Sequence, residues 1–108
     1  MGPAALEVIG VEAVGYDEPV LSFTLVFNTT AEEPLVADPL DPAKWSGAWQ
    51  GGGMAPLTAE VVAFDRIAIT LQGTAGPAGT SSVSYAAGPS DVSDTLGRQL
   101  AAFEEFPL

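Results

Sequence analysis

The sequence predicts an all-β fold, because hydrophobic and polar residues alternate in short runs that glycine, proline, aspartate and asparagine separate. Side chains alternate across a strand, so every second residue of such a run faces the same side. The clearest runs are 21–27, 67–72 and 82–85, with predicted inward residues Leu21, Phe23, Leu25, Phe27, Ile67, Ile69, Leu71, Val83 and Tyr85. These three runs predict the centre of the fold.

Four weaker strands complete the pattern, at 4–14, 43–50, 57–63 and 99–106. The first is expected to bend at Gly10, where the alternation changes register. The second places Trp45, Gly47 and Trp49 on one face, and the third places Ala59, Val61 and Ala63 opposite Thr58 and Glu60. We expect a flexible glycine tip at 51–53, a tight turn near 64–65, and, as an alternative to the last strand, a helical turn near 95–99.

Seven short strands in 108 residues predict one domain spanning 1–108. With an aromatic-bearing third strand, they favour an immunoglobulin-like Greek-key β-sandwich of about seven strands. A small jelly-roll or barrel is the alternative. The chain has no cysteine, so neither a disulfide framework nor a thiolate metal site is expected.

The charge balance disfavours two classes of partner. Three basic residues against 14 acidic ones give a net charge of −11, which repels phosphate backbones and anionic lipids. We therefore expect neither nucleic-acid nor membrane binding, and no apolar run approaches the ~18 residues of a spanning helix. The start of the chain lacks the basic and apolar regions of a signal peptide, so we expect no secretion by that route.

The order of several short motifs resembles one Ig-like repeat. These motifs are Leu25-Val26-Phe27, Leu40-Asp41-Pro42-Ala43-Lys44-Trp45, Ile67-Ala68-Ile69-Thr70-Leu71, Val83-Ser84-Tyr85 and the segment from Asp94 to Phe103. The repeat type is found in large bacterial surface proteins, including the cyanobacterial swimming-motility protein, and in phage structural proteins. The similarity covers roughly 20–106, and Gly97-Arg98 stands where that family usually has Gly-Asn.

The resemblance implies a non-catalytic structural or interaction protein. Our first expectation is a phage virion component, either a capsid decoration or cement protein or a tail-accessory module. Its partners would be capsid or tail subunits, or further copies of itself in a homo-oligomer. The alternative is a bacterial cell-surface adhesin or glycan-binding module. The family usually occurs as tandem copies, so a single copy is expected to act by docking onto another protein.

Catalysis is not expected from the residue types present. The chain has no histidine and no cysteine, which removes the commonest general base and the thiol nucleophile. A small hydrolase that uses two carboxylates ranks last, because it needs a cleft that holds both of them in opposed environments. We expect no organic cofactor.

Acidic loop residues form the predicted metal site. Asp38 and Asp41 lie between the second and third predicted strands, and Asp91 and Asp94 lie between the last two. In an Ig-like sandwich these loops emerge at the same end, where their carboxylates can supply oxygen to calcium. The alternative is that all four are solvated turn residues, since aspartate is common in turns.

Aromatic and terminal residues form the predicted interface. Trp45 is expected to fill the core, as tryptophan on the third strand does in such sandwiches. Trp49 lies beside the glycine tip and is expected at an interface, where tryptophan is enriched. Phe103, Phe106 and Leu108 either hold the last strand in place or dock on a neighbouring subunit.

If calcium binds these aspartates, millimolar calcium will raise the melting temperature, because a ligand that binds only the folded state stabilises it. The measurement is a thermal melt in calcium against the same melt in a chelator. An unchanged melting temperature would remove the calcium site.

Overall fold

The predicted all-β class is confirmed in the computed structural model, which describes residues 5–108. Its strands are β1 (Val8–Asp17), β2 (Val20–Phe27), β3 (Trp45–Trp49), β4 (Gly52–Ala63), β5 (Arg66–Gln72), β6 (Ser82–Tyr85) and β7 (Phe103–Pro107), with one 3-10 turn, η1 (Pro42–Lys44). The part of the first predicted strand at residue 4 lies outside the described residues.

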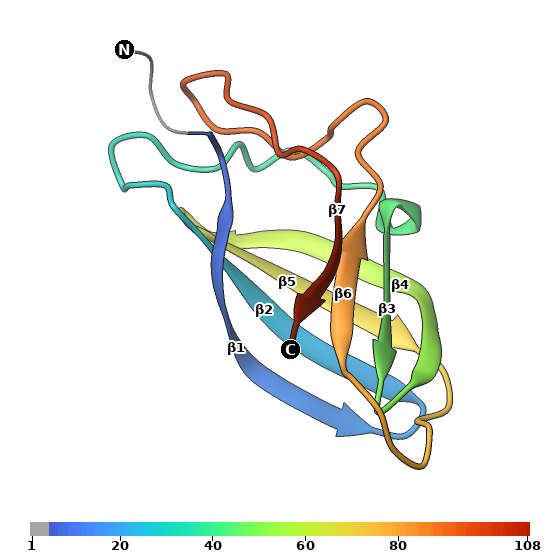
Figure 1. Cartoon of the computed structure of the whole chain (residues 1–108). Coiled ribbons are helices and arrows are strands. Elements are labelled where there is room, and N and C mark those ends of the chain that lie inside the picture. Colours follow the sequence, from blue (N-terminus) through green and yellow to red (C-terminus); the bar gives the residue numbers. More distant parts are fainter. Residues whose placement is uncertain (1–4) are drawn as a thin grey trace.

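The seven strands form one antiparallel sheet in the order β1-β2-β5-β4-β3-β6-β7. β4 connects its two parts, because Gly52–Met54 pair with β3 and the rest of the strand pairs with β5. The sheet curls, so that β3, β6 and β7 lie in front of β2, β5 and β4 (Figure 1). β1 and β7 are its two edges.

The core lies on the inner face of this curled sheet and confirms the predicted inward residues. All nine residues predicted to face inward from 21–27, 67–72 and 82–85 are buried, and Trp45 is fully buried among them. The other buried hydrophobic residues are Leu6, Leu35, Leu40, Met54, Val92 and Leu100. Trp45 packs at a tilt against Tyr85, with ring centroids 4.5 Å apart, and its full burial confirms its predicted core role.

Some element boundaries differ from the predictions for local reasons. The register of β1 shifts between Val8 and Gly10, as expected, but the strand continues to Asp17. The last strand begins at Phe103 instead of 99, because buried Leu100 donates its N–H to the carbonyl of Val92 and holds the preceding segment in a loop. No helix forms at 94–103.

The expected glycine tip is a packed structure. Only Gln50 and Gly51 form the turn, with φ of 51° and 85°, whereas Gly52 and Gly53 already belong to β4. Both positive φ values match a two-residue type I′ hairpin turn. A side chain on Gly52 would collide with the backbone of Thr74, because the turn packs directly against the loop that follows β5.

Neighbouring glycines of β4 provide a matched test of this packing. Gly52→Ala is expected to destabilise the protein by about 1–3 kcal/mol, because backbone atoms must move to accept the new methyl group. Gly53→Ala has no atom within 4 Å of its new methyl group and is expected to leave stability unchanged or slightly raised. Chemical denaturation measures both, and equal effects would contradict the packing.

Candidate functional site

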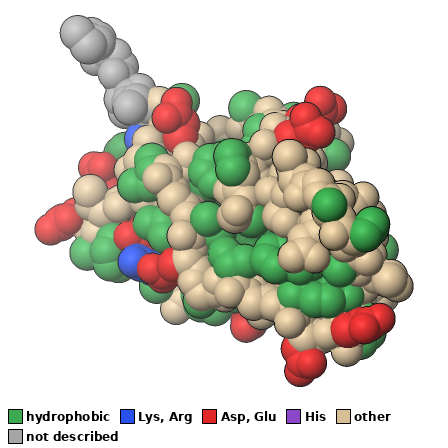
Figure 2. Space-filling view, turned by 60° about the horizontal axis from the view of Figure 1, so that its bottom comes forward, with side chains coloured by type: hydrophobic (Ala, Val, Ile, Leu, Met, Phe, Trp, Pro, Cys, Tyr) green, Lys and Arg blue, Asp and Glu red, His purple; other side chains and the backbone are tan. Residues whose placement is uncertain are grey.

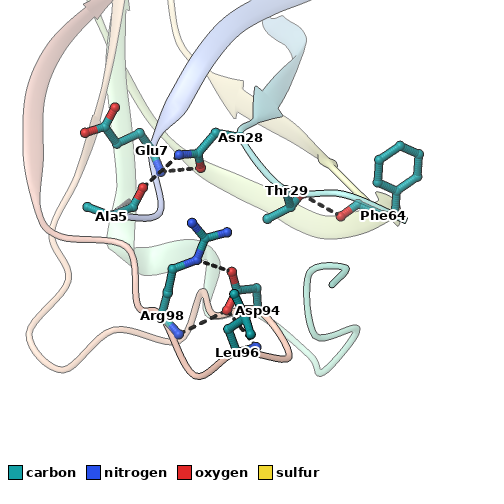
Figure 3. Close-up of polar contacts among 8 residues, drawn as sticks. All are labelled: Ala5, Glu7, Asn28, Thr29, Phe64, Asp94, Leu96 and Arg98. Carbon is teal, nitrogen blue, oxygen red and sulfur yellow. Dashed lines mark hydrogen bonds and ion pairs between the residues drawn. The ribbon is translucent and has the colours of Figure 1, made fainter. Parts of the chain in front are cut away.

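Asp94 and Arg98 form the principal buried ion pair at the loop end of the sheet. The Nε of Arg98 lies 2.6 Å from Oδ2 of Asp94, whose side chain is fully buried. Oδ1 of Asp94 accepts hydrogen bonds from the N–H groups of Leu96 and Arg98, each at 3.0 Å (Figure 3). Both carboxylate oxygens are thus bonded within the 94–98 turn, which Gly97 completes with φ of 83°.

This turn ties three segments that lie far apart in the sequence. Thr95 donates its N–H to the carbonyl of Pro34 at 3.0 Å, and the N–H of Leu35 reaches the carbonyl of Phe64 at 2.8 Å. Leu35 also forms an isolated bridge with Asp94. Backbone hydrogen bonds therefore join the long loops before β3 and β7 to each other and to the β4–β5 turn, and the buried carboxylate of Asp94 holds the 94–98 turn in shape for this contact.

Asn28 performs a similar role at the start of β1. Its side-chain amide donates to the carbonyl of Ala5 at 2.7 Å and accepts from the N–H of Glu7 at 2.9 Å (Figure 3). Thr29 donates its hydroxyl to the carbonyl of Phe64 at 2.9 Å. Asn28 thus continues the β1–β2 hydrogen bonding beyond the strands and holds the chain before Val8, while Thr29 fixes the end of β2 to the β4–β5 turn.

Asp91 links the loop after β6 to the loop before β3. Its Oδ2 accepts from the N–H of Asp41 at 2.6 Å, and its Oδ1 accepts from the hydroxyl of Tyr85 at 2.6 Å. Asp41 in turn caps η1 by accepting from the N–H of Ala43 at 3.0 Å. Burial, followed by the hydrogen bond to Asp91, raises the pKa of Tyr85 above its ordinary value of 10.0.

The four aspartates of the predicted calcium site have different positions. Asp41 and Asp91 are joined by a hydrogen bond, whereas the oxygens of Asp94 are bonded to the N–H groups and guanidinium of its own turn. Asp38 is exposed on the loop before η1. Within residues 5–108, no group of three or more acidic, histidine or cysteine side chains converges on a common point. Calcium binding stays a prediction.

The four predicted interface residues are partly buried and pack against the core. Trp49 stacks on Tyr16 with ring centroids 6.0 Å apart, and Phe103 and Phe106 meet edge to face at 6.2 Å. Leu108 donates its N–H to the carbonyl of Ser81. The contacts of Phe103 with Trp45 and Tyr85, together with the hydrogen bond of Leu108, hold β7 in place. Docking on a neighbouring subunit stays a prediction.

Phe103 and Phe106 also line an apolar groove that sequence reasoning missed. Its other lining residues are Leu6, Glu7, Val8, Leu100, Ala101 and Ala102, and its volume is about 250 Å³. We call it the edge groove, because it lies between the start of β1 and β7, the two edges of the sheet. A larger, open depression of about 840 Å³ lies beside it over Ser46, Ser84, Glu104 and Glu105.

Two of the three basic residues, Arg66 and Lys44, bond to neighbouring groups of the chain itself. Arg66 pairs with Glu12 at 2.6 Å and with Asp65, contacts that raise its pKa, the hydrogen bond to Glu12 contributing most. Lys44 donates to the carbonyls of Ala87 and Pro89. Figure 2 shows hydrophobic side chains gathered in the middle of one face, with acidic side chains around its rim.

Comparisons of the chain with protein-family models, curated proteins and solved structures found no match. No helix within residues 5–108 is long and apolar enough to cross a membrane.

Removing the cation of the buried pair tests its structural role. Arg98→Met is expected to lower the free energy of unfolding by about 3–5 kcal/mol, because it leaves the buried carboxylate of Asp94 without its charged partner. Glu12→Gln removes a charge from the exposed pair with Arg66 and is expected to have a far smaller effect. Urea denaturation measures both, and a mild effect of Arg98→Met would refute the role.

The raised pKa of Tyr85 predicts a dependence on high pH. A group whose pKa is higher in the folded state contributes stability that is complete below pH 10.0 and is lost as the pH rises through the folded pKa. In a Tyr16→Phe background, ultraviolet absorbance is expected to show Tyr85 ionising above its ordinary value. Asp91→Asn is expected to lower this pKa only in part, because burial is the larger cause. Ionisation at the ordinary value would contradict the prediction.

Proposed function

We propose that this protein is an Ig-like β-sandwich that binds another protein as a structural component of a phage virion. The strand order supports the fold assignment. β1-β2-β5-β4 and β3-β6-β7 correspond to the A-B-E-D and C-F-G groupings of an Ig-like Greek key. The buried Trp45 on β3 occupies the place of the core tryptophan of such folds.

The edge groove is the observation that carries the binding role. β1 and β7 each pair with a single neighbour, so one side of each strand has no strand partner within the described chain. Exposed edges accept added strands, and an apolar groove beside them receives side chains of the added segment. Such a surface suits a protein that binds another protein, and the resemblance of the sequence to repeats of phage structural proteins favours a capsid decoration, cement or tail-accessory role.

A bacterial cell-surface adhesin or glycan-binding module is the second candidate. The aromatic pair of Tyr16 and Trp49 favours it, because the pair is stacked, partly exposed and located beside the β3–β4 turn. Aromatic rings that expose one face bind the apolar faces of sugars. A glycan array probed with the protein and with Trp49→Ala tests this candidate directly.

The experiment that tests the proposed function is quantitative mass spectrometry of purified particles and of cell envelopes from the natural source. A ratio near one copy per major capsid subunit supports capsid decoration, and a few copies per particle support a tail-accessory role. Enrichment in the envelope supports the adhesin instead. Absence from particles overturns the virion proposal.

A further inference from the structure

We propose that single extra residues in β1 and β7 close both free edges of the sheet, so that copies of this chain do not pair edge to edge. A free strand edge is a template on which a second copy can add its own strand. The inference goes beyond the proposed function, because it concerns contacts between copies of the chain and not the contact of the edge groove with another protein.

β1 is interrupted at two places. Ile9 has no partner residue on β2, and Ala13 and Val14 lie together opposite one residue of β2. Regular pairing of β1 is therefore limited to residues 10–12 and 15–17. Backbone N–H and C=O groups alternate between the two sides of a strand, and an extra residue breaks this alternation. A second strand added along β1 could therefore keep its register over three residues at most.

β7 is interrupted in the same way. Glu104 and Glu105 lie together opposite Ser84 of β6. The N–H of Glu105 donates to the hydroxyl of Ser84 at 3.0 Å, which fixes the bulge in place. Pro107 then ends the strand and has no N–H to donate. The bulge and the proline together leave β7 without a long regular edge.

Both bulges hold a residue in a backbone conformation that costs stability. Ala13 and Glu105 have φ of 53° and 55°, in the left-handed region where residues other than glycine are strained. Within residues 5–108, the one other non-glycine residue with a positive φ is Gln50, which forms the β3–β4 turn. Such strain persists where the surrounding structure enforces it, and it is often linked to function. Its occurrence on both edge strands points to a role at the edges.

The strained residues contribute nothing to the core, because Ala13 and Glu105 are both exposed. Removing either one would restore strict alternation along its strand, as in the sequences Val11-Glu12-Val14-Gly15-Tyr16 and Phe103-Glu104-Phe106. The hydrophobic residues of both strands would keep the faces that they have now. The sequence could therefore form a regular strand at either edge, and one extra residue prevents it.

The test compares deletion of Ala13 or of Glu105 with Ala13→Gly and Glu105→Gly, which keep the bulges. Sedimentation velocity over a concentration series measures self-association in about 1 M sodium chloride, where charges are screened beyond ~3 Å. The wild-type chain and both glycine variants are expected to stay monomeric. Each deletion variant is expected to shift from monomer to dimer as its concentration rises. The variant that lacks Ala13 is expected to shift more strongly, because β1 is the longer strand.

The glycine variants separate the bulge from charge and strain. Glu105→Gly removes the same charge and the same strain as deletion of Glu105, so a difference between these two variants reports on the bulge alone. Nitrogen-15 spectra establish that each variant is folded and locate the contact. Amide shifts that depend on concentration are expected at 10–17 in the variant that lacks Ala13 and at 103–106 in the variant that lacks Glu105.

Four results would overturn the proposal. Three of them are self-association of the wild-type chain through β1 or β7, deletion variants that remain monomeric, and glycine variants that associate as strongly as the deletion variants. The fourth is loss of the folded state in either deletion variant, because a residue that only protects an edge is not needed for the fold.

Discussion

The curl of the sheet depends on β4, which changes partner along its length. Its first residues, Gly52–Met54, pair with β3, and the remainder pairs with β5 across two register shifts. Bulges increase the local twist of a strand, and glycines accept the bend. Because of this exchange, β3, β6 and β7 lie over the inner faces of β2 and β5, and residues from both parts share one core. A sheet without this bend would leave Trp45 and Tyr85 without partners on the opposite side.

The two ends of the sheet are held by different physical means. At the loop end, buried Asp94 and the side-chain amide of Asn28 replace the missing backbone partners of long connections. At the other end, the turn at Gln50 and Gly51 packs directly against the backbone of the loop after β5. The loop end needs particular polar side chains. The turn needs glycine at positions 51 and 52, because any side chain there would collide with the backbone of the loop after β5. The edge groove lies at the loop end, between the two edge strands β1 and β7.

Local patterns predicted those parts of the fold that depend on neighbouring residues. The strict alternation in β2, β5 and β6 identified their buried faces, and the position of Trp45 on the third strand identified its core role. The early part of β4 was missed, because Gly-Gly-Met-Ala-Pro has little strand propensity and pairs only through tertiary context. The start of β7 was misplaced because a long-range hydrogen bond from Leu100 to Val92 decides it.

The candidate sites were less predictable than the buried faces of the strands. Asp94 and Arg98 are four residues apart with a glycine between them, a signal of a closed turn that the calcium interpretation did not use. The edge groove joins residues 6–8 to 100–106, and no local pattern reveals such a contact. The glycine packing also limits how the sequence of this chain can change. Away from Asn28, Asp94 and Arg98, a side chain at the loop end can be exchanged on its own, whereas a new side chain at Gly51 or Gly52 would require the turn and the loop after β5 to change together.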